Sequence, residues 1–180
     1  MKRTGHLYEK ICDKQNIRTA IYKAAKGKRH RTDVQKILRN IDKYVDHIHH
    51  LLTNQIYRPA DYSEGVVTEG SKNKERKIFK PHFYPDQIVH WAIMLQLAPV
   101  LRKGMYGITC GSVPGRGVHY GKKYMERWLI ADRKNTKYYL KMDISKFYPS
   151  VDLPTLEKKL ATKIKDKKLL RLIHIILEKG

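Results

Sequence analysis

Residues 138–152 have the sequence YYLKMDISKFYPSVD, and they carry the clearest structural pattern in this chain of 180 residues. Apolar and polar side chains alternate over 138–144, and this period of two predicts a β-strand. The side chains expected on its apolar face are those of Leu140, Met142 and Ile144. Asp143 would lie on the opposite face near the strand end, where a carboxylate can project into a cleft and bind Mg²⁺, a cation that prefers oxygen ligands.

Tyr148 follows Asp143 at the point where the chain is expected to leave the strand and turn back. An aromatic ring at this place could form the floor of a nucleotide pocket beside the carboxylate. The plainer interpretation makes Asp143 a simple strand-end residue and Tyr148 a core residue. The spacing alone leaves both interpretations open.

The segments on either side of this strand are predicted to be helical. Asp152 with Pro154 predicts the start of one helix, Asp166 is expected to cap the next, and Gly180 suits its C-terminal end. A helix from about residue 118 is expected to turn one face inward. The residues of that face are Val118, Gly121, Met125, Trp128 and Leu129.

The first half of the chain predicts a long helix and a β-hairpin. A stripe of aliphatic residues at three-four spacing predicts a helix over about 33–56, with Thr32 and Gln35 as a capping box. Residues 65–68 and 76–80 have the composition of two hairpin strands joined by a polar, glycine-containing stretch.

Prolines, glycines and one aspartate mark the boundaries of the segments after the hairpin. Pro81 is expected to end its second strand, and Asp86 to cap a helix that ends near Pro99. Residues 104–117 are predicted to be a loop because they contain five glycines and one proline. The whole pattern indicates a mixed α/β (α+β) chain that is rich in helix.

The chain is strongly basic, with 38 Lys and Arg against 17 Asp and Glu and a formal net charge of +21. Such an excess costs self-repulsion, which a polyanion offsets because each neutralised phosphate releases condensed counterions. The charge therefore favours nucleic acid and, more weakly, an anionic membrane; a generally basic solvated surface is the alternative. The run KGKRHR at 26–31 is expected to be a loop that either contacts phosphate or is a solvated connector.

The two cysteines, Cys12 and Cys110, form no Cys-x-x-Cys pair, which excludes a zinc ribbon or a dithiol redox motif. No run of about 18 apolar residues predicts a transmembrane helix, and the first residues lead into no apolar signal core. We therefore expect a cytoplasmic protein with free thiols and no membrane partner.

Three stretches resemble, in order, motifs of reverse transcriptases, which are RNA-directed DNA polymerases. RKIFKP at 76–81 with DQIVH at 86–90 resembles the first fingers motif, and GSVPGRGVH at 111–119 resembles the second. The strand ending in DI at 143–144, followed by FY at 147–148, resembles the first palm motif. The N-terminal region is most similar to bacterial and phage enzymes of diversity-generating retroelements, followed by group II intron reverse transcriptases.

The resemblance implies the fingers and the first part of the palm of a right-hand polymerase, with a fingers hairpin and short palm strands. A basic helical extension would span 1–60, the fingers 61–136 and the start of the palm 137–180. The implied reaction extends a DNA or RNA primer with dNTPs on an RNA template, using two Mg²⁺ ions. Its partners would include the remaining part of the polymerase or a basic accessory protein.

The resemblance also implies roles around the metal and the sugar. Asp143 would be the catalytic carboxylate that binds both metal ions, and the backbone carbonyl of Ile144 would add a ligand. Tyr148 would lie under the sugar and exclude a 2′-hydroxyl, so that deoxynucleotides are selected.

Two further groups would bind the triphosphate and the template. Arg76 would clamp the incoming triphosphate through its planar fork, helped by Lys72 or Lys74, between which the sequence does not choose. The residues that would lie against the template strand are Gly115, Arg116 and Gly117, where glycine permits close backbone approach.

The sequence departs from the family pattern because it contains neither Tyr-x-Asp-Asp nor any Asp-Asp pair. Only one of the family's three catalytic carboxylates is therefore expected here, and the thumb is absent as well. These residues alone are expected not to polymerise, whether they come from a truncated gene or are completed by another chain. The alternative function is a non-catalytic basic RNA-binding module of maturase or accessory type. An RNA-synthesising or primase-like palm is a third interpretation, which Tyr148 disfavours.

Overall fold

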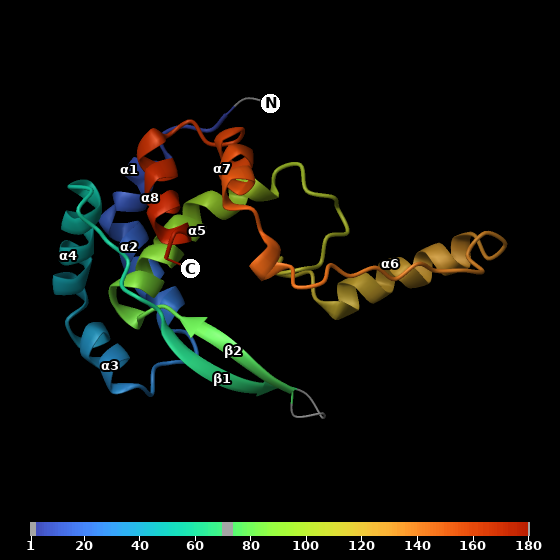
Figure 1. Cartoon of the computed structure of the whole chain (residues 1–180), viewed down its shortest axis with the longest axis horizontal. Helices are drawn as coiled ribbons and strands as arrows, with labels where there is room; N and C mark the ends of the chain where they lie inside the picture. The colour runs from blue at the N-terminus through green and yellow to red at the C-terminus, as the bar shows by residue number, and fades with distance from the viewer. Residues whose placement is uncertain (1–2, 70–73, 180) are drawn as a thin grey trace. The chain divides into compact units, whose positions relative to one another are not determined.

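The computed structural model describes residues 3–69 and 74–179 (Figure 1). Packing divides the chain into two units. Unit 1 consists of residues 1–100 and 152–180, and unit 2 consists of residues 101–151. Unit 1 has a helical core and a β-hairpin, whereas unit 2 has one long helix, one short helix and irregular connecting segments.

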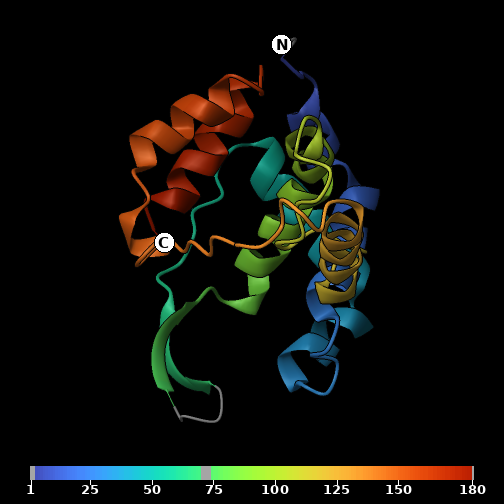
Figure 2. The ribbon, with the colours of Figure 1, turned by 90° about the vertical axis from the view of Figure 1, so that its right-hand side faces the viewer.

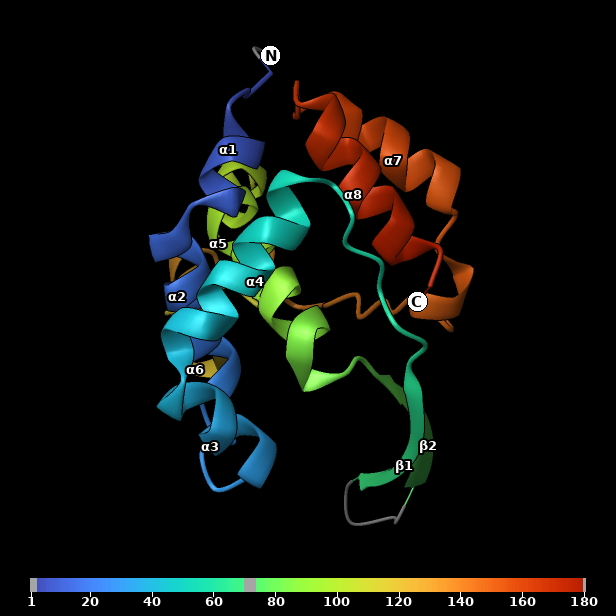
Figure 3. The ribbon, with the colours of Figure 1, turned by 90° about the vertical axis from the view of Figure 1, so that its left-hand side faces the viewer.

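The core of unit 1 is built from α1 (Leu7–Cys12), α2 (Lys14–Ala25), α4 (Ile41–Thr53) and α5 (Ile88–Arg102) (Figure 3). The aliphatic side chains that these helices turn toward one another are almost wholly buried. They include Ile11, Ile17, Ile21, Ile48, Leu52 and Val89. Burial of this apolar surface is the main term that stabilises the unit.

Buried polar contacts fix how these helices pack. The Tyr8 hydroxyl donates to the Leu52 carbonyl at 2.7 Å, which joins α1 to α4. The Asn16 side-chain amide donates to the Ala92 carbonyl at 3.1 Å, which joins α2 to α5. A polar group is costly to bury unless it is hydrogen-bonded, so these pairs favour one packing arrangement over others.

A break at Asn40 divides the helix predicted over 33–56 into α3 (Thr32–Arg39) and α4. Asn40 has φ −123° and ψ 40°, which interrupts the helical hydrogen bonds. The prediction of one helix was wrong because the apolar stripe continues across the break. The predicted Thr32 cap was also wrong, since Arg31 holds the cap position and makes no side-chain capping bond.

α7 (Leu153–Ala161) and α8 (Lys167–Leu177) lie side by side in unit 1 (Figure 2). The start of α7 is as predicted, because the Asp152 side chain accepts a hydrogen bond from the Thr155 N–H at 2.9 Å. Gly180, expected at the end of the last helix, lies outside the described residues.

The segment between α7 and α8 binds the N-terminal segment. Asp166 holds the N-cap position of α8, yet its carboxylate accepts hydrogen bonds from the N–H groups of His6 and Leu7 at the start of α1. Thr4 also forms a parallel bridge with Ile164. The position predicted for Asp166 was correct, but the predicted capping bond was wrong. Its carboxylate accepts hydrogen bonds at the start of α1 and none from α8.

β1 (Ser63–Glu69) and β2 (Lys74–Lys80) form an antiparallel hairpin, which confirms both predicted strands. Pro81 follows β2 directly, as expected of a residue that cannot donate to a strand ladder. The coarse class, helix-rich with a hairpin, is confirmed. Within residues 3–69 and 74–179, every helix is too short or too polar to cross a membrane.

The predicted palm strand over 138–144 is not formed. The described part of the chain contains one sheet, that of β1 and β2, and residues 138–144 take no part in it. The prediction of short palm strands was therefore wrong for this chain. Alternation specifies which face each side chain takes, but a strand also needs a partner for its backbone hydrogen bonds.

α5 follows a single turn, η1 (Phe83–Gln87), and both predictions about its ends were wrong. Asp86 lies inside this turn and is fully buried instead of capping a helix. α5 continues through Pro99 to Arg102. A proline there removes one N–H donor without ending the helix, because its effect is confined to the last turn.

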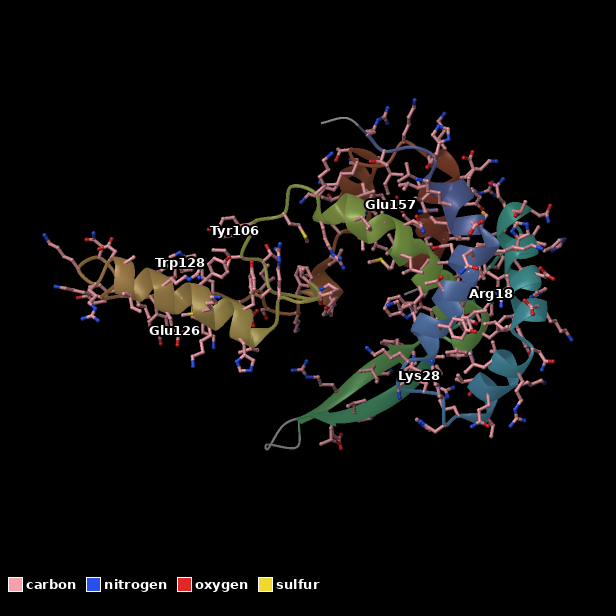
Figure 4. All side chains as sticks on the ribbon, turned by 180° about the vertical axis from the view of Figure 1, so that it is seen from behind. Arg18, Lys28, Tyr106, Glu126, Trp128 and Glu157 are labelled. Atoms are coloured by element: carbon pink, nitrogen blue, oxygen red, sulfur yellow. The ribbon has the colours of Figure 1, made fainter. Side chains whose placement is uncertain are left out.

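Unit 2 contains α6 (Val118–Ala131), preceded by the predicted loop over 104–117 (Figure 4). No residue of 101–151, all of which are described, is buried. The apolar residues expected to face inward are instead exposed, including Met125 at 57 % and Trp128 at 47 %. That prediction was wrong because an amphipathic pattern defines a face, and nothing within the unit covers it.

Candidate nucleic-acid interface

The hairpin carries the first group of predicted site residues. Arg76 is exposed and lies opposite Val67 in the ladder. Lys77 forms an ion pair with Glu64 at 2.7 Å and lies over the Phe79 ring, with 5.4 Å between its ammonium and the ring centroid. Because successive residues of a strand point to opposite faces, Arg76 occupies the face away from this ion pair.

The two lysines predicted beside Arg76 are placed to different extents. Lys74 begins β2 opposite Glu69, so its backbone lies on the same strand as Arg76. Lys72 lies outside the described residues. The predicted assistance from one of them therefore stays a prediction.

A turn before α6 brings the predicted template-binding residues together. Gly115 has φ +77°, in the left-handed region that glycine adopts without strain. The Arg116 N–H donates to the Val113 carbonyl at 3.0 Å, and Gly117 is the N-cap residue of α6. The Arg116 guanidinium lies 5.6 Å from the ring centroid of Tyr120.

The sequence prediction missed a row of arginines and tyrosines that continues from this turn along α6. Tyr120 and Tyr124 have ring centroids 5.0 Å apart, and the Arg127 guanidinium lies 5.6 Å from the Tyr124 ring. Spacings of three and four residues bring these side chains to one helix face. Aromatic rings and guanidinium groups both stack on nucleic-acid bases. The spacing was visible in the sequence, but the apolar residues of the same helix directed the prediction toward a buried face.

Asp143, Ile144 and Tyr148 lie in one exposed stretch of unit 2. One carboxylate oxygen of Asp143 accepts a hydrogen bond from the Ile144 N–H at 3.0 Å. Tyr148 begins the short helix η2 (Tyr148–Ser150), is 87 % exposed and meets Phe147 edge-to-face with 5.4 Å between ring centroids. Both predicted side chains are thus accessible to a ligand, and the nucleotide pocket expected around them stays a prediction.

The oxygen atoms at this stretch suit magnesium only in part. A carboxylate and a backbone carbonyl are ligands that Mg²⁺ accepts. Across the described ranges, no group of three or more His, Cys, Asp or Glu side chains could hold a metal ion. Asp143 and Ile144 therefore fit as part of a magnesium site and do not complete one.

The predicted site residues fall into three local groups: the hairpin with Arg76, the turn at 115–117 and the stretch at 143–148. The hairpin belongs to unit 1, and the other two groups belong to unit 2. Unit 2 is basic, with eleven Lys or Arg and three Asp or Glu. This charge surrounds both groups in sequence and suits a phosphate backbone.

A buried polar cluster at the base of the hairpin was also missed. The Tyr57 hydroxyl donates to Asp86 at 2.7 Å, and burial followed by this bond raises the pKa of Tyr57. Burial lowers the pKa of His90, against an opposing effect of the Asp86 charge. Within the described residues, the second Asp86 oxygen and the His90 Nε2 have no hydrogen-bond partner. No local sequence pattern predicts the hydrogen bond between Tyr57 and Asp86, because Tyr57 precedes the hairpin and Asp86 follows it.

No family model matches the chain, and no curated protein matches it. A proposed function therefore rests on the motifs and on the geometry of these three groups.

Proposed function

We propose that this chain is the N-terminal part of a reverse transcriptase, comprising the fingers and the first part of the palm. The observation that carries the proposal is the order of three features along the chain. A hairpin bearing Arg76 comes first, a Gly-Arg-Gly turn leading into α6 comes second, and Asp143 with the aromatic pair at 147–148 comes last. The net charge of +21 supports a nucleic-acid substrate.

In this proposal the exposed cations bind the nucleic acid and the nucleotide. The planar guanidinium of Arg76 clamps the triphosphate of the incoming dNTP. Arg116 and its flanking glycines lie against the RNA template, and the tyrosines of α6 extend that surface. The ring of Tyr148 lies under the sugar and excludes a 2′-hydroxyl, so the primer is extended with deoxynucleotides.

Asp143 would hold part of the magnesium site. When bound, two magnesium ions activate the primer 3′-hydroxyl and stabilise the leaving pyrophosphate. One carboxylate cannot satisfy two such ions, so the proposed enzyme needs carboxylates that these 180 residues lack. The chain by itself should bind template–primer and should not extend it, and robust Mg²⁺-dependent extension by the purified chain would contradict this requirement.

The proposal is tested by primer extension with the protein encoded by the complete reading frame. Asp143→Asn should abolish Mg²⁺-dependent synthesis, because it removes a metal-binding carboxylate. Asp132→Asn is the matched control, since Asp132 is an exposed residue of the same unit whose carboxylate, within the described residues, accepts hydrogen bonds only from nearby Asn135. Equal synthesis by the two variants would overturn the catalytic assignment of Asp143.

A second candidate function is a non-catalytic RNA-binding module. It is favoured by the exposure of residues 138–144, which pair with no strand, and by the absence, among the described residues, of any group of three or more possible metal-binding side chains. For such a module, the reading frame would supply no Tyr-x-Asp-Asp, and Asp143→Asn would leave template–primer binding unchanged in the presence of Mg²⁺. For the polymerase, the same substitution would remove the Mg²⁺-dependent part of dNTP binding.

A further inference from the structure

A cavity of about 760 Å³ lies where the basic loop at 26–31 meets the base of the hairpin in unit 1. Its walls come from that loop and α3, from the first residue of β1 and the last residues of β2, and from η1. Figure 4 labels Lys28 just past the end of α2, close to the base of the hairpin. The volume falls within the range of small-ligand sites and suits a nucleotide.

The loop that carries Lys28 is held by its own backbone. The Lys28 N–H donates to the Ala25 carbonyl at 2.9 Å, and the Arg31 N–H donates to the Lys28 carbonyl at 3.0 Å. Gly27 takes φ +75°, which permits the tight reversal between these turns. Lys28 is therefore placed on the cavity wall by the fold of the loop.

Lys28 is a half-buried cation whose contacts are neutral. Its ammonium hydrogen-bonds the side-chain oxygen of Gln87 and lies 5.9 Å from the Phe83 ring centroid. Arg31 differs, because it forms an ion pair with Asp33 at 2.6 Å. Burial, followed by repulsion from Arg31, lowers the pKa of Lys28. The charge of Asp33, which also lines the cavity and pairs with Arg31, opposes this shift. An anionic ligand that contacts the Lys28 ammonium directly would stabilise this partly desolvated cation.

A further basic residue and an aromatic ring line the same cavity. His82 contributes the basic group, and Phe79 contributes a ring that is 57 % exposed. Lys80 also borders the cavity, but its ammonium lies against Gly65, on the other face of the hairpin. A cation next to an exposed aromatic ring is the combination that binds a nucleotide unit, because the phosphate meets the charge and the base stacks on the ring.

We propose that this cavity binds one nucleotide of a single-stranded nucleic acid, with the phosphate at Lys28 and the base against Phe79. The inference rests on the proposed function, to which it adds a specific contact for the strand. The net charge of +21 favours a strand over a free nucleotide, since a polyanion neutralises more of that charge.

The test compares two lysines of one loop in the 180-residue chain. Lys28→Gln and Lys26→Gln remove the same charge, but only Lys28 lines the cavity, and Lys26 is exposed. Binding of a fluorescent oligouridylate of about 12 nucleotides is followed by anisotropy. Lys28→Gln should weaken binding about 10- to 100-fold, and Lys26→Gln at most about threefold, since a charged hydrogen bond in a half-buried site contributes more than a screened surface charge.

A second pair of variants tests the aromatic wall and does not depend on the folding of Lys28→Gln. Phe79→Ala should weaken binding about 5- to 100-fold through loss of stacking, whereas Val66→Ala, at another exposed position of the hairpin, should leave it unchanged. Equal losses within both pairs would overturn the cavity site.

The same assay distinguishes a nucleic-acid strand from a free nucleotide as the ligand. It also distinguishes failure of the cavity site from failure of the proposed function. Uridine monophosphate should compete weakly, and competition as effective as that of the oligonucleotide would overturn the strand in favour of a free nucleotide. If the unmodified chain binds the oligonucleotide and the paired variants lose equally, the cavity fails while the proposed function stands. If the unmodified chain binds no oligonucleotide, both fail.

Discussion

The helices of unit 1 bury a continuous set of aliphatic side chains, whereas residues 101–151 bury none of theirs. Yet unit 2 carries Asp143, Tyr148 and Arg116, the residues on which the proposed chemistry depends. An apolar pattern in the sequence therefore does not by itself decide whether a segment is buried: the patterned helices of unit 1 are buried, and those of residues 101–151 are not. Within the described residues, aliphatic side chains of unit 1 pack on one another, whereas the apolar residues of α6 and of the alternating stretch at 138–144 are exposed.

Charge is the property that the two units share, and it gives the largest expected effect. Binding of a template–primer duplex should fall by about 10³- to 10⁵-fold between about 50 and 200 mM salt, if about six to ten phosphates are contacted. Equilibrium binding across this salt range measures the slope. A flat response would show that the basic surface is merely solvated.

A matched pair of isoleucines tests the contrast in burial. Ile48→Ala in α4 should lower the free energy of unfolding by about 2–5 kcal/mol, because it leaves a cavity in the core. Ile130→Ala in α6, where the side chain is 68 % exposed, should change it by less than about 0.5 kcal/mol. Urea unfolding of both variants measures the difference, and equal losses would remove the distinction between the units.

The buried polar cluster of Tyr57 and Asp86 tests the same contrast in burial between the two units, with a smaller expected loss of stability. Tyr57→Phe should cost about 1–3 kcal/mol of stability, because the buried Asp86 carboxylate loses its hydrogen-bond donor. Tyr138→Phe is the control in unit 2, where the tyrosine is 93 % exposed, and it should cost nothing measurable. Thermal unfolding distinguishes the two, and an unaffected Tyr57→Phe variant would contradict the role given to that bond.

The smallest expected effect depends on pH. Burial holds the pKa of His90 below its ordinary value of 6.5, so protonation favours the unfolded chain. This contribution to stability is present above pH 6.5 and is lost as the pH falls through the lowered pKa. The pKa of His174 is raised, first by its bond to Glu157, and this histidine acts with the opposite sign. The difference between the unmodified chain and His90→Phe over about pH 7.5 to 5 isolates the His90 effect, and parallel curves would contradict it.

Much of unit 1 was predictable because its signals are local. The hairpin follows from alternation around a polar turn, and Asp152 announces α7 through a bond to a residue three positions away. The errors arose where a distant residue decides the outcome. Asp166 bonds across the fold to Leu7, and Asp86 bonds to Tyr57, so neither shows the capping contact that its position suggests.

For the candidate site, the sequence predicted which residue types occur and their order along the chain, but only part of the local structure around them. The turn at 115–117 formed as its glycines indicate, and the hairpin placed Arg76 on an exposed face. The absence of a strand over 138–144 could not be derived from the local sequence. Alternation sets the face that each side chain takes, but a strand also needs a partner for its backbone hydrogen bonds. The arginine–tyrosine row of α6 was overlooked because the same helix carries an apolar stripe.

Amide hydrogen exchange tests most directly whether residues 138–144 lack backbone hydrogen-bond partners in this chain. In the 180-residue chain, the amides of 138–144 should exchange almost as fast as those of an unfolded peptide, while those of α2, α4 and the hairpin are protected. If the proposed polymerase is completed by further palm strands, the same seven amides should become protected in that complete protein. Protection of 138–144 already in the short chain as a monomer, or fast exchange in both proteins, would contradict the account.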